Sequence, residues 1–514
     1  MPNAAVLLDP VTVGSLFLLF VFYLRARWAR ARLPYPPGPK PLPLIGNLFD
    51  FPRVTPWVTY RQMAKQYGDV ISLRALGHVV VVLNSVDAAR ELLEKRGAIY
   101  SDRPAVPFLE MMDMDFHLSL SRYPSPWRMR RKLIDRSFRP SATLQYRSVQ
   151  QTKVKHFLRK LLANPEGFDH HVAHCMGSIL LAINYDYDLK DIGDRYTAIN
   201  EEVSSIASES ILPGATIVNN VPFLKYLPGW LPGMEFQARA QRGLILYQEM
   251  INVPFLHVKE QWKNGTATRS FTSDNLQVLG DEKEETEIKN AAATLNAAGI
   301  ETTGSVSTTL FLMLASYPDV QKKAQAELDA VVGRDRLPDW ADRPQLPYIQ
   351  AVCNELTRWQ PVTPLGVAHA TTEDDIYEGY LIPKGAVVIA NSWAILHDPA
   401  VYPSPETFMP ERHLTADGAV KEDPLLSAAF GFGRRMCPGR HLADSTLWIF
   451  VASVIASFQV DKAKDAEGQE IPLDVAYTDG LVSLPKPFKC AIAPRDERAA
   501  SLVKSSAHPV AASA

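Results

Sequence analysis

The pattern of hydrophobic and polar positions predicts a small β part. Residues 79–83 are a β-branched run bounded by glycine and asparagine, which is typical of a strand. Residues 87–96 have the spacing of a short amphipathic helix that Gly97 would terminate. Between residues 360 and 412, proline, glycine and β-branched residues alternate, which indicates short strands and irregular coil.

The rest of the chain is predicted to be helical. Residues 145–345 carry a mostly helical pattern, and residues 287–317 are its longest uninterrupted stretch before Pro318. The acidic run at 281–287 suits a helix N-terminus, although a solvated charged face gives the same pattern. Residues 442–458 are apolar and helical again. We therefore expect a mainly α fold with a smaller β part.

The N-terminus predicts a membrane anchor. Residues 4–24 are nearly all apolar, and arginines follow at positions 25, 27, 30 and 32. About twenty apolar residues span a bilayer, and the arginines would stay on the cytosolic side. We predict an anchor with its basic flank over residues 1–32 and a proline-rich hinge over 33–43, with a buried N-terminal helix as the alternative. A cleaved signal peptide fits less well, because no basic residue precedes the apolar run.

Composition narrows the class of protein. The chain has 514 residues, of which 46% are hydrophobic and 21% charged, with a net charge of −2. This is ordinary globular composition, and without a basic excess no nucleic-acid partner is expected. Four scattered cysteines without a CxxC pair predict neither a disulfide framework nor a structural zinc site. We expect one catalytic domain over residues 44–498 and a disordered tail over 499–514.

One cysteine stands in a loop suited to metal binding. Residues 430–440 read FGFGRRMCPGR and precede the apolar helical stretch. The three glycines would let the backbone approach a flat, bulky group. Nearby arginines and a helix N-terminus favour the thiolate of Cys437 over the thiol. A thiolate there is a good soft metal ligand.

This loop resembles the haem-binding signature FxxGxRxCxG of the cytochrome P450 superfamily. Its five fixed positions are matched by Phe430, Gly433, Arg435, Cys437 and Gly439. The resemblance implies that Cys437 is the axial thiolate of a haem iron and that Arg435 pairs with a haem propionate. It also implies the family's fold, with the haem between a long central helix and the cysteine loop.

A pair of charges further upstream resembles the ExxR motif of the same family. Glu355 and Arg358 lie three residues apart and therefore share a helix face. Arg412, in the segment 408–412, matches the third member of the family's buried structural lock. The family pattern ends in phenylalanine, whereas this chain has His413, so the local packing is expected to differ.

The segment AGIETT at 298–303 lies within the longest predicted helix. Glycine in mid-helix costs about 1 kcal/mol, and Thr302 can bond back to the helix backbone, so a kink or groove is predicted; close helix packing is the alternative. The segment resembles the family's oxygen-activation sequence. That resemblance implies that Thr302 orients the activated oxygen and that Glu301 supplies protons to it.

Residues 127–131 read WRMRR and are similar to the family's WxxxR. The resemblance implies that Trp127 and Arg131 hold haem propionates, and that His369 makes another such contact. The alternative is a basic helix face that contacts an electron donor through Arg128, Arg130 and Lys132.

Two other segments are open to a functional and a structural interpretation. Residues 170–175 carry three histidines and a cysteine at helical spacing; we prefer ordinary helix packing to a metal site. Residues 211–236 are apolar with prolines and glycines, and resemble the family's access lid, which contacts lipid. A plain apolar surface loop is the alternative.

The resemblance implies a microsomal, fungal-like monooxygenase. The expected reaction inserts one oxygen atom of O2 into a small apolar organic substrate, with electrons from NADPH through a separate reductase. The expected location is the endoplasmic reticulum membrane, single-pass, with a cytosolic catalytic domain. A haem-thiolate isomerase or dehydratase without reductase and a non-enzymatic haem-binding protein are the alternatives. By analogy, the pocket is expected to include Phe108, Leu295, Val362, Thr363 and Leu365.

Overall fold

The computed structural model describes residue 21 and the ranges 33–75, 77–123, 125–190, 194–211, 216–278 and 280–506. The predicted anchor over residues 1–32 lies outside these ranges except for residue 21. Within the described part of the chain, no helix is both long and apolar enough to cross a membrane.

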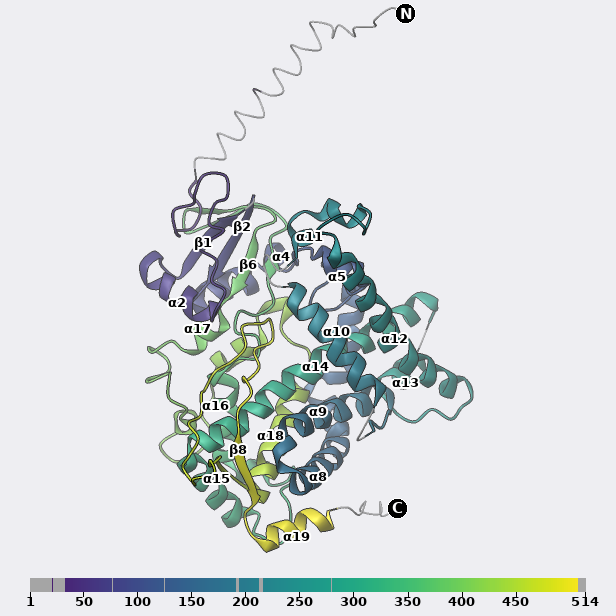
Figure 1. Cartoon of the computed structure of the whole chain (residues 1–514), viewed down its shortest axis with the longest axis vertical. Coiled ribbons are helices and arrows are strands. Elements are labelled where there is room, and N and C mark those ends of the chain that lie inside the picture. The colour runs from purple at the N-terminus through teal and green to yellow at the C-terminus, as the bar shows by residue number, and fades with distance from the viewer. Residues whose placement is uncertain are drawn as a thin grey trace, which may run out of the picture.

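The molecule consists of a large helical region with a small sheet at one end (Figure 1). The predicted mainly α fold with a smaller β part is confirmed. The strands are β1 (Val70–Ala75), β2 (His78–Leu83), β3 (His369–Ala370), β4 (Asp375–Tyr377), β5 (Tyr380–Ile382), β6 (Val387–Ala390), β7 (Phe458–Lys462) and β8 (Cys490–Pro494). The helices are α2 (Pro56–Tyr67), α3 (Val86–Ala89), α4 (Gly97–Tyr100), α5 (Pro107–Met111), α6 (Ser125–Phe138), α7 (Pro140–Thr143), α8 (Arg147–Ala163), α9 (Phe168–Tyr185), α10 (Arg195–Ile211), α11 (Ile217–Asn220), α12 (Glu235–Lys263), α13 (Phe271–Leu276), α14 (Glu282–Ser316), α15 (Pro318–Val331), α16 (Pro347–Trp359), α17 (Ser392–Leu396), α18 (Arg440–Ser457) and α19 (Glu497–Ser505).

The largest sheet joins segments that lie far apart in the sequence. Its strand order is β1-β2-β6-β3, with β1 and β2 antiparallel and β2 and β6 parallel. The predicted strand at 79–83 is β2. The predicted helix at 87–96 instead begins as α3 and passes into a π-helix at Arg90–Lys95, and Gly97 begins α4 rather than ending the first helix.

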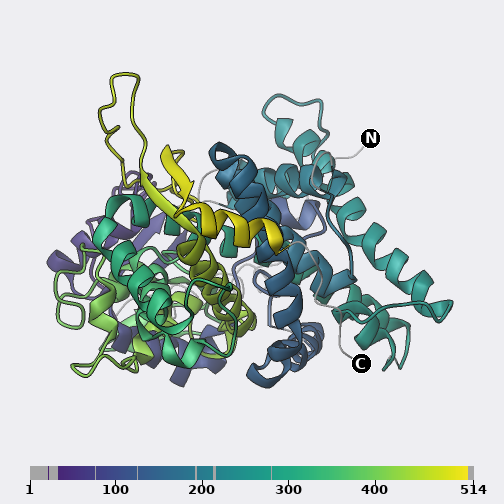
Figure 2. The ribbon, with the colours of Figure 1, turned by 90° about the horizontal axis from the view of Figure 1, so that it is seen from below.

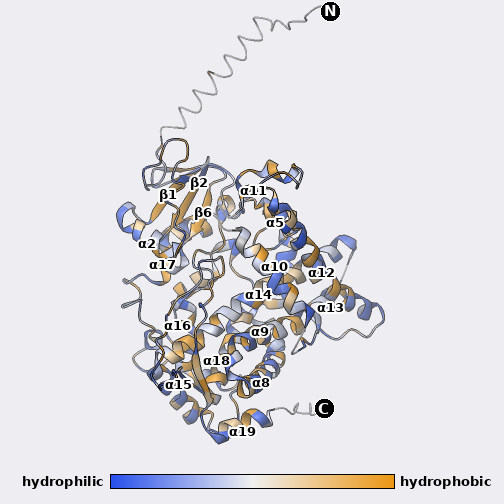
Figure 3. Ribbon diagram, viewed as in Figure 1, coloured by the Kyte–Doolittle hydropathy of each residue, from blue (hydrophilic) through white to orange (hydrophobic). Residues whose placement is uncertain are grey.

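The longest predicted helix is α14, which starts earlier than its apolar pattern. The Asp281 side chain accepts a hydrogen bond of 2.9 Å from the Glu284 N–H, and this cap brings the acidic turn into the helix. Helix α14 is continuous to Ser316 and packs against α9, α6, α12 and α18. Hydrophobic residues concentrate along these inner helices and the sheet (Figure 3). Helix α14 therefore runs through the core.

Two predicted flanks are more ordered than their composition indicated. In the proline-rich segment, the carbonyls of Pro36 and Pro37 accept hydrogen bonds from the side chain and N–H of Ser72 on β1. Residues 34–39 therefore belong to the body and are not a free hinge.

The prediction of a disordered tail is wrong for residues 499–505, which form most of α19. Its Ala499 and Val503 are buried, and the helix lies against α8 and α18 (Figure 2).

Candidate functional site

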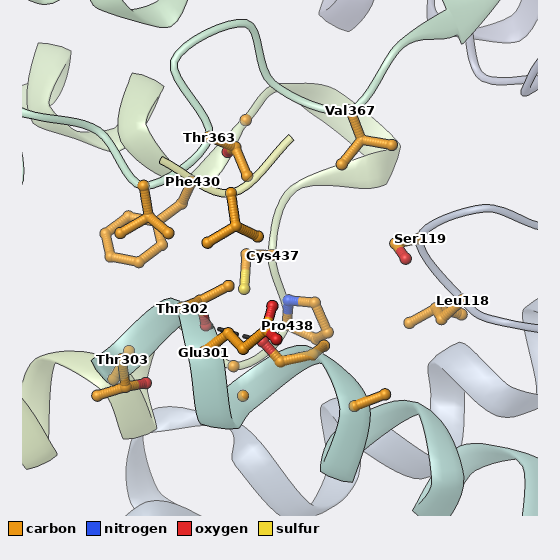
Figure 4. A pocket seen from close by; sticks show the side chains of 18 of the residues that line it. Leu118, Ser119, Glu301, Thr302, Thr303, Thr363, Val367, Phe430, Cys437 and Pro438 are labelled. Atoms are coloured by element: carbon orange, nitrogen blue, oxygen red, sulfur yellow. Dashed lines mark hydrogen bonds between the residues drawn. The ribbon is translucent and has the colours of Figure 1, made fainter. Parts of the chain in front are cut away.

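A cavity of about 460 Å³ lies between the cysteine loop and α14. Figure 4 shows the side chains of Cys437, Glu301 and Thr302 projecting into it from these two elements. Most of the lining surface is apolar, and it comes from α9, α10, α12, α14 and the segments around residues 118, 362 and 481. The site residues predicted from the sequence that also line this cavity are Thr302, Glu301, Cys437, Arg435, Trp127, Arg131, His369, Phe430 and Gly439.

The cysteine loop is held by its own backbone. The Cys437 N–H donates to the Phe430 carbonyl at 2.8 Å, and the Arg131 guanidinium donates to the Met436 carbonyl at 2.7 Å. Gly433 has φ +56°, and a Cβ at this position would lie 2.2 Å from the Leu93 carbonyl oxygen. Gly433 does not line the cavity. The glycine is therefore required by contact with the protein's own backbone, not by the approach of a bulky ligand.

Burial dominates the chemistry of the Cys437 thiol. It raises the pKa of the thiol above its usual range, while the N–H groups of Gly439 and Arg440 and the charges of Arg131 and Arg440 act in the opposite direction. The groups expected to favour the thiolate are therefore present, but the loss of hydration on burial outweighs them and favours the neutral thiol. A cation placed at the sulfur would reverse this balance.

Helix α14 presents an acid and a hydroxyl side by side. The Thr302 hydroxyl donates to the Ala298 carbonyl at 2.8 Å (Figure 4), the back-bonding expected from the sequence. Burial raises the pKa of Glu301, and the neighbouring Ser204 hydroxyl acts to lower it. At Gly299 a Cβ would lie 2.6 Å from Leu180 on α9, so this glycine serves close helix packing, the alternative considered above.

Basic side chains gather at one edge of the cavity. The Arg435 guanidinium is stacked 4.4 Å from the Trp127 ring and donates to the carbonyls of Ser101, Leu118 and Ser121. The Trp127 indole N–H donates to the Leu118 carbonyl at 2.9 Å. Burial lowers the pKa of Arg435 to about 10. In the structure, therefore, these donors point mainly at backbone carbonyls.

Arg103 is a member of this basic group that the sequence analysis missed. It is 4% exposed and donates to the carbonyls of Val367 and Ala368, whereas its Nε has no hydrogen-bond partner within the described ranges. Burial and the neighbouring Arg435 lower the pKa of Arg103 well below its usual value. Burial and the charges of Arg103 and Arg435 likewise lower the pKa of His369 well below its usual value. No short motif surrounds Arg103, so only its position in the fold reveals it.

The predicted lock residues meet away from the cavity. The Arg358 Nε lies 2.7 Å from Glu355 Oε2, and the Arg412 Nε lies 3.2 Å from Glu355 Oε1; Glu355 and Arg358 are fully buried. His413, where phenylalanine was expected, places its Nε2 2.9 Å from Glu355 Oε2. Burial alone would raise the pKa of Glu355, but the hydrogen bonds from His413 and Arg358 lower it to about 2.

Part of the predicted pocket lining was placed wrongly. Leu295, Val362 and Thr363 do line the cavity. Phe108 instead belongs to a separate buried cluster with α10 and α12, and Leu365 packs beneath the sheet. Leu481 and Val482 line the cavity although no sequence signal marked them. Their neighbour Ser483 fixes them, because its carbonyl accepts from Ser305 and its hydroxyl from Gln360.

Two other sequence interpretations can now be compared with the structure. Arg130 does not belong to an exposed basic face, since it is 4% exposed and its Nε lies 2.7 Å from Glu287 on α14. In the histidine segment of α9, His171 is bonded to the Asn164 carbonyl and His174 to the Lys190 carbonyl. Both interactions tie α9 to adjacent loops.

Comparison with known proteins gives a consistent result. Residues 36–492 match the protein family described as "Cytochrome P450". A cytochrome P450 monooxygenase of Coprinopsis cinerea named COX2 is 41% identical over 93% of this chain and 92% of its own. Cytochrome P450 monooxygenase 208 of Postia placenta is 41% identical over 95% of both chains, and tryptamine 4-monooxygenase of Psilocybe cyanescens is 38% identical over 93% of this chain and 96% of its own.

The chain therefore belongs to the cytochrome P450 family, the haem-thiolate enzymes. It is an oxidoreductase that incorporates oxygen from O2. The cavity fits the haem that this family implies. The thiol of the glycine-rich loop, Cys437, lies on its wall. The buried arginines beside it, including Arg103 with its unpaired Nε, would complement the two carboxylates of a haem.

Proposed function

We propose that this protein inserts one atom of O2 into a small apolar organic substrate, with electrons from NADPH delivered by a separate reductase. The balanced reaction is RH + O2 + NADPH + H⁺ → ROH + H2O + NADP⁺. The observation that carries the proposal is the shared cavity, in which the Cys437 thiol and the Glu301–Thr302 pair lie within a mostly apolar lining.

Each site residue has a proposed role. Cys437 ligates the haem iron, and the bound haem supplies oxygen activation. The haem carboxylates would be held by Arg103, Arg131, Arg435, Trp127 and His369. Phe430 and Gly439 line the cavity on the cysteine loop. Gly433 acts indirectly, by allowing the loop to turn against Leu93. Glu355, Arg358 and Arg412 hold the fold around the loop.

Glu301 and Thr302 are the proposed proton-delivery groups. Because burial raises the pKa of Glu301, its carboxyl can hold and release a proton closer to neutral pH than an exposed glutamate. The Thr302 hydroxyl, now bonded to Ala298, is one residue away and can turn toward the cavity. Aliphatic walls exclude bulk water, so protons enter through these side chains.

Two partners follow from this proposal. Helix α6 exposes Arg128, Lys132 and Arg136 at four-residue spacing on one face, which is a suitable docking site for an acidic reductase.

Leu44 and Phe49 are 100% and 75% exposed, and Phe223, Tyr226 and Trp230 are exposed near α11 at the same end of the molecule (Figure 1). We propose that this end lies in the endoplasmic reticulum membrane beside a single-pass anchor over residues 1–32, with the catalytic domain on the cytosolic side.

The central test uses variants of Cys437 and Thr302 with a purified microsomal reductase. The reduced carbon monoxide complex should show the Soret band of a thiolate-ligated haem, and Cys437→Ala should abolish it. Thr302→Ala should keep that band but divert NADPH oxidation from product to peroxide, whereas Thr302→Ser should restore coupling. Product formation without reductase would favour an isomerase or dehydratase instead.

The membrane proposal has a separate test. Removal of residues 1–32 should reduce sedimentation with vesicles but leave residual binding through the exposed apolar end. Leu44→Ser with Phe49→Ser in that truncated protein should remove the residual binding, while haem content stays the same. Loss of haem on truncation would place the segment in the folded body.

A further inference from the structure

Helix α10 turns one face toward the cavity. Residues 200, 203, 204, 207 and 208 line it, which is the i, i+3, i+4, i+7, i+8 spacing of a single helix face. Val203 and Ala207 are apolar, and Asn200, Ser204 and Ser208 are polar. Ser204 is hydrogen-bonded to Glu301, and the Ser208 hydroxyl donates to the Ser205 carbonyl, so Asn200 is the polar residue of this face that needs an explanation.

Asn200 is the most deeply buried polar residue of this face. It is 9% exposed, and within the described ranges no hydrogen bond of its side chain is found. Its amide atoms are not among the fully buried polar atoms that lack a partner, so they are accessible from the cavity that Asn200 lines. Asn200 therefore offers a donor and an acceptor to a molecule in the cavity.

Other buried polar side chains on the cavity wall are bonded within the protein. The His117 ring lies 2.7 Å from the Tyr247 hydroxyl, and burial lowers the pKa of His117 to about 4, so the ring stays neutral. The Thr294 hydroxyl donates to the Asn290 carbonyl at 2.8 Å. These groups stabilise the wall. Asn200 differs from them because nothing in the wall uses its amide.

We propose that Asn200 is a specificity residue that binds an uncharged oxygen group, a hydroxyl or a carbonyl, on an otherwise apolar substrate. An amide both donates and accepts, so it suits either group but compensates no charge. The inference rests on the proposed monooxygenase function and narrows its substrate class from hydrocarbons to molecules that already carry oxygen.

Matched pairs of probes test this inference. The purified holoenzyme is titrated with cedrol and cedrene, with 1-adamantanol and adamantane, and with 2-(2-naphthyl)ethanol and 2-ethylnaphthalene. The readout is the dissociation constant from the substrate-induced change in the haem spectrum, which does not require turnover. For at least one skeleton, the alcohol should bind about tenfold more tightly than its hydrocarbon, as expected for one satisfied buried amide.

Two variants assign the preference to Asn200. Asn200→Leu keeps the volume but removes the hydrogen bond, so the alcohol should lose about tenfold in affinity while the hydrocarbon changes little. Val203→Ala, on the same helix face, should alter both members of a pair alike. The inference is overturned if no alcohol binds more tightly than its parent, if no alcohol changes the spectrum, or if Asn200→Leu leaves the ratio unchanged. A missing thiolate band with carbon monoxide would instead refute the proposed function.

Discussion

Two groups of buried arginines in this protein are compensated in opposite ways. Arg358 is fully buried and paired with the Glu355 carboxylate, which Arg412 and His413 also contact. Arg103 and Arg435 are almost as buried, yet within the described ranges neither forms an ion pair; their partners are backbone carbonyls. Burying an uncompensated charge is costly. The first group contacts its counter-charge directly, whereas in the second the charge of Asp102 acts on both arginines without forming an ion pair with either. The second group is therefore the better candidate for binding the carboxylates of a haem.

The largest expected effect is on the compensated group. Glu355→Gln would leave Arg358 and Arg412 buried beside a neutral amide, so the protein should lose about 3–5 kcal/mol of stability. Urea unfolding or the yield of folded protein measures this loss. Glu406→Gln is the control, because Glu406 is 64% exposed in its pair with Arg61 and should cost less than about 1 kcal/mol. Equal effects of the two substitutions would contradict the assigned difference in burial.

The uncompensated group should respond in the opposite way. Arg103→Leu removes a buried cation without an ion-pair partner, so the haem-free protein should keep or gain stability. Haem retention should fall, with transfer to apomyoglobin about 10–100-fold faster, since a charge-assisted hydrogen bond contributes about 1.5–3 kcal/mol. Arg122→Leu is the control, because Arg122 is 71% exposed. If Arg103→Leu instead unfolds the haem-free protein, Arg103 is a structural residue.

The pH dependence separates the two regions further. The buried His369 has a pKa well below its usual value, so below pH ~6.5 the unfolded chain binds a proton that the folded chain does not. Stability should therefore fall as the pH drops below ~6.5, by at most about 1.4 kcal/mol per pH unit from this residue. His369→Asn should flatten that slope in urea unfolding, and replacement of the exposed His78 should not. The Glu355 contribution, with a pKa of about 2, is lost only at more acidic pH, between about 4.5 and 2.

The smallest expected effect concerns His413. His413→Phe restores the usual family residue and removes one hydrogen bond to Glu355, while both arginines remain. The loss of about 1 kcal/mol should be partly offset by the burial of the phenyl ring. Thermal unfolding measures it. A loss as large as that of Glu355→Gln would mean that the histidine is the main counter-charge.

The comparison also shows what sequence alone can reveal. Residues in short motifs, such as Cys437, Glu355 and Thr302, could be proposed because their spacing is local. Arg103 could not, because the residues that make it unusual, Arg435 and Val367, are more than 260 positions away. His413 was recognised as a departure from the pattern, but its contact with Glu355 depends on side-chain packing that a pattern does not encode.

The same distinction holds for the fold. The strand at 79–83 is a run of mainly β-branched residues and the long helix is an uninterrupted helical stretch, and both were predicted. The start of α14 depended instead on a single cap at Asp281. Helix α19 has an amphipathic pattern, with the buried Ala499 and Val503 one turn apart, but it is short and mostly polar, so composition favoured the wrong prediction of a disordered tail. Phe108 was misplaced because its burial against α10 and α12 is a tertiary contact, and the pattern of its own short helix does not show whether it faces those helices or the cavity.

The attachment of residues 34–39 to β1 determines where mechanical force from the N-terminus is applied. Because the carbonyls of Pro36 and Pro37 are bonded to Ser72, any tether leading out of residue 33 pulls on the sheet and not on the helices around the cavity. Such a force would act on the body at one strand. A shortened protein that begins after residue 39 would expose the edge of that strand, so residue 34 is the first position that a truncated variant should keep.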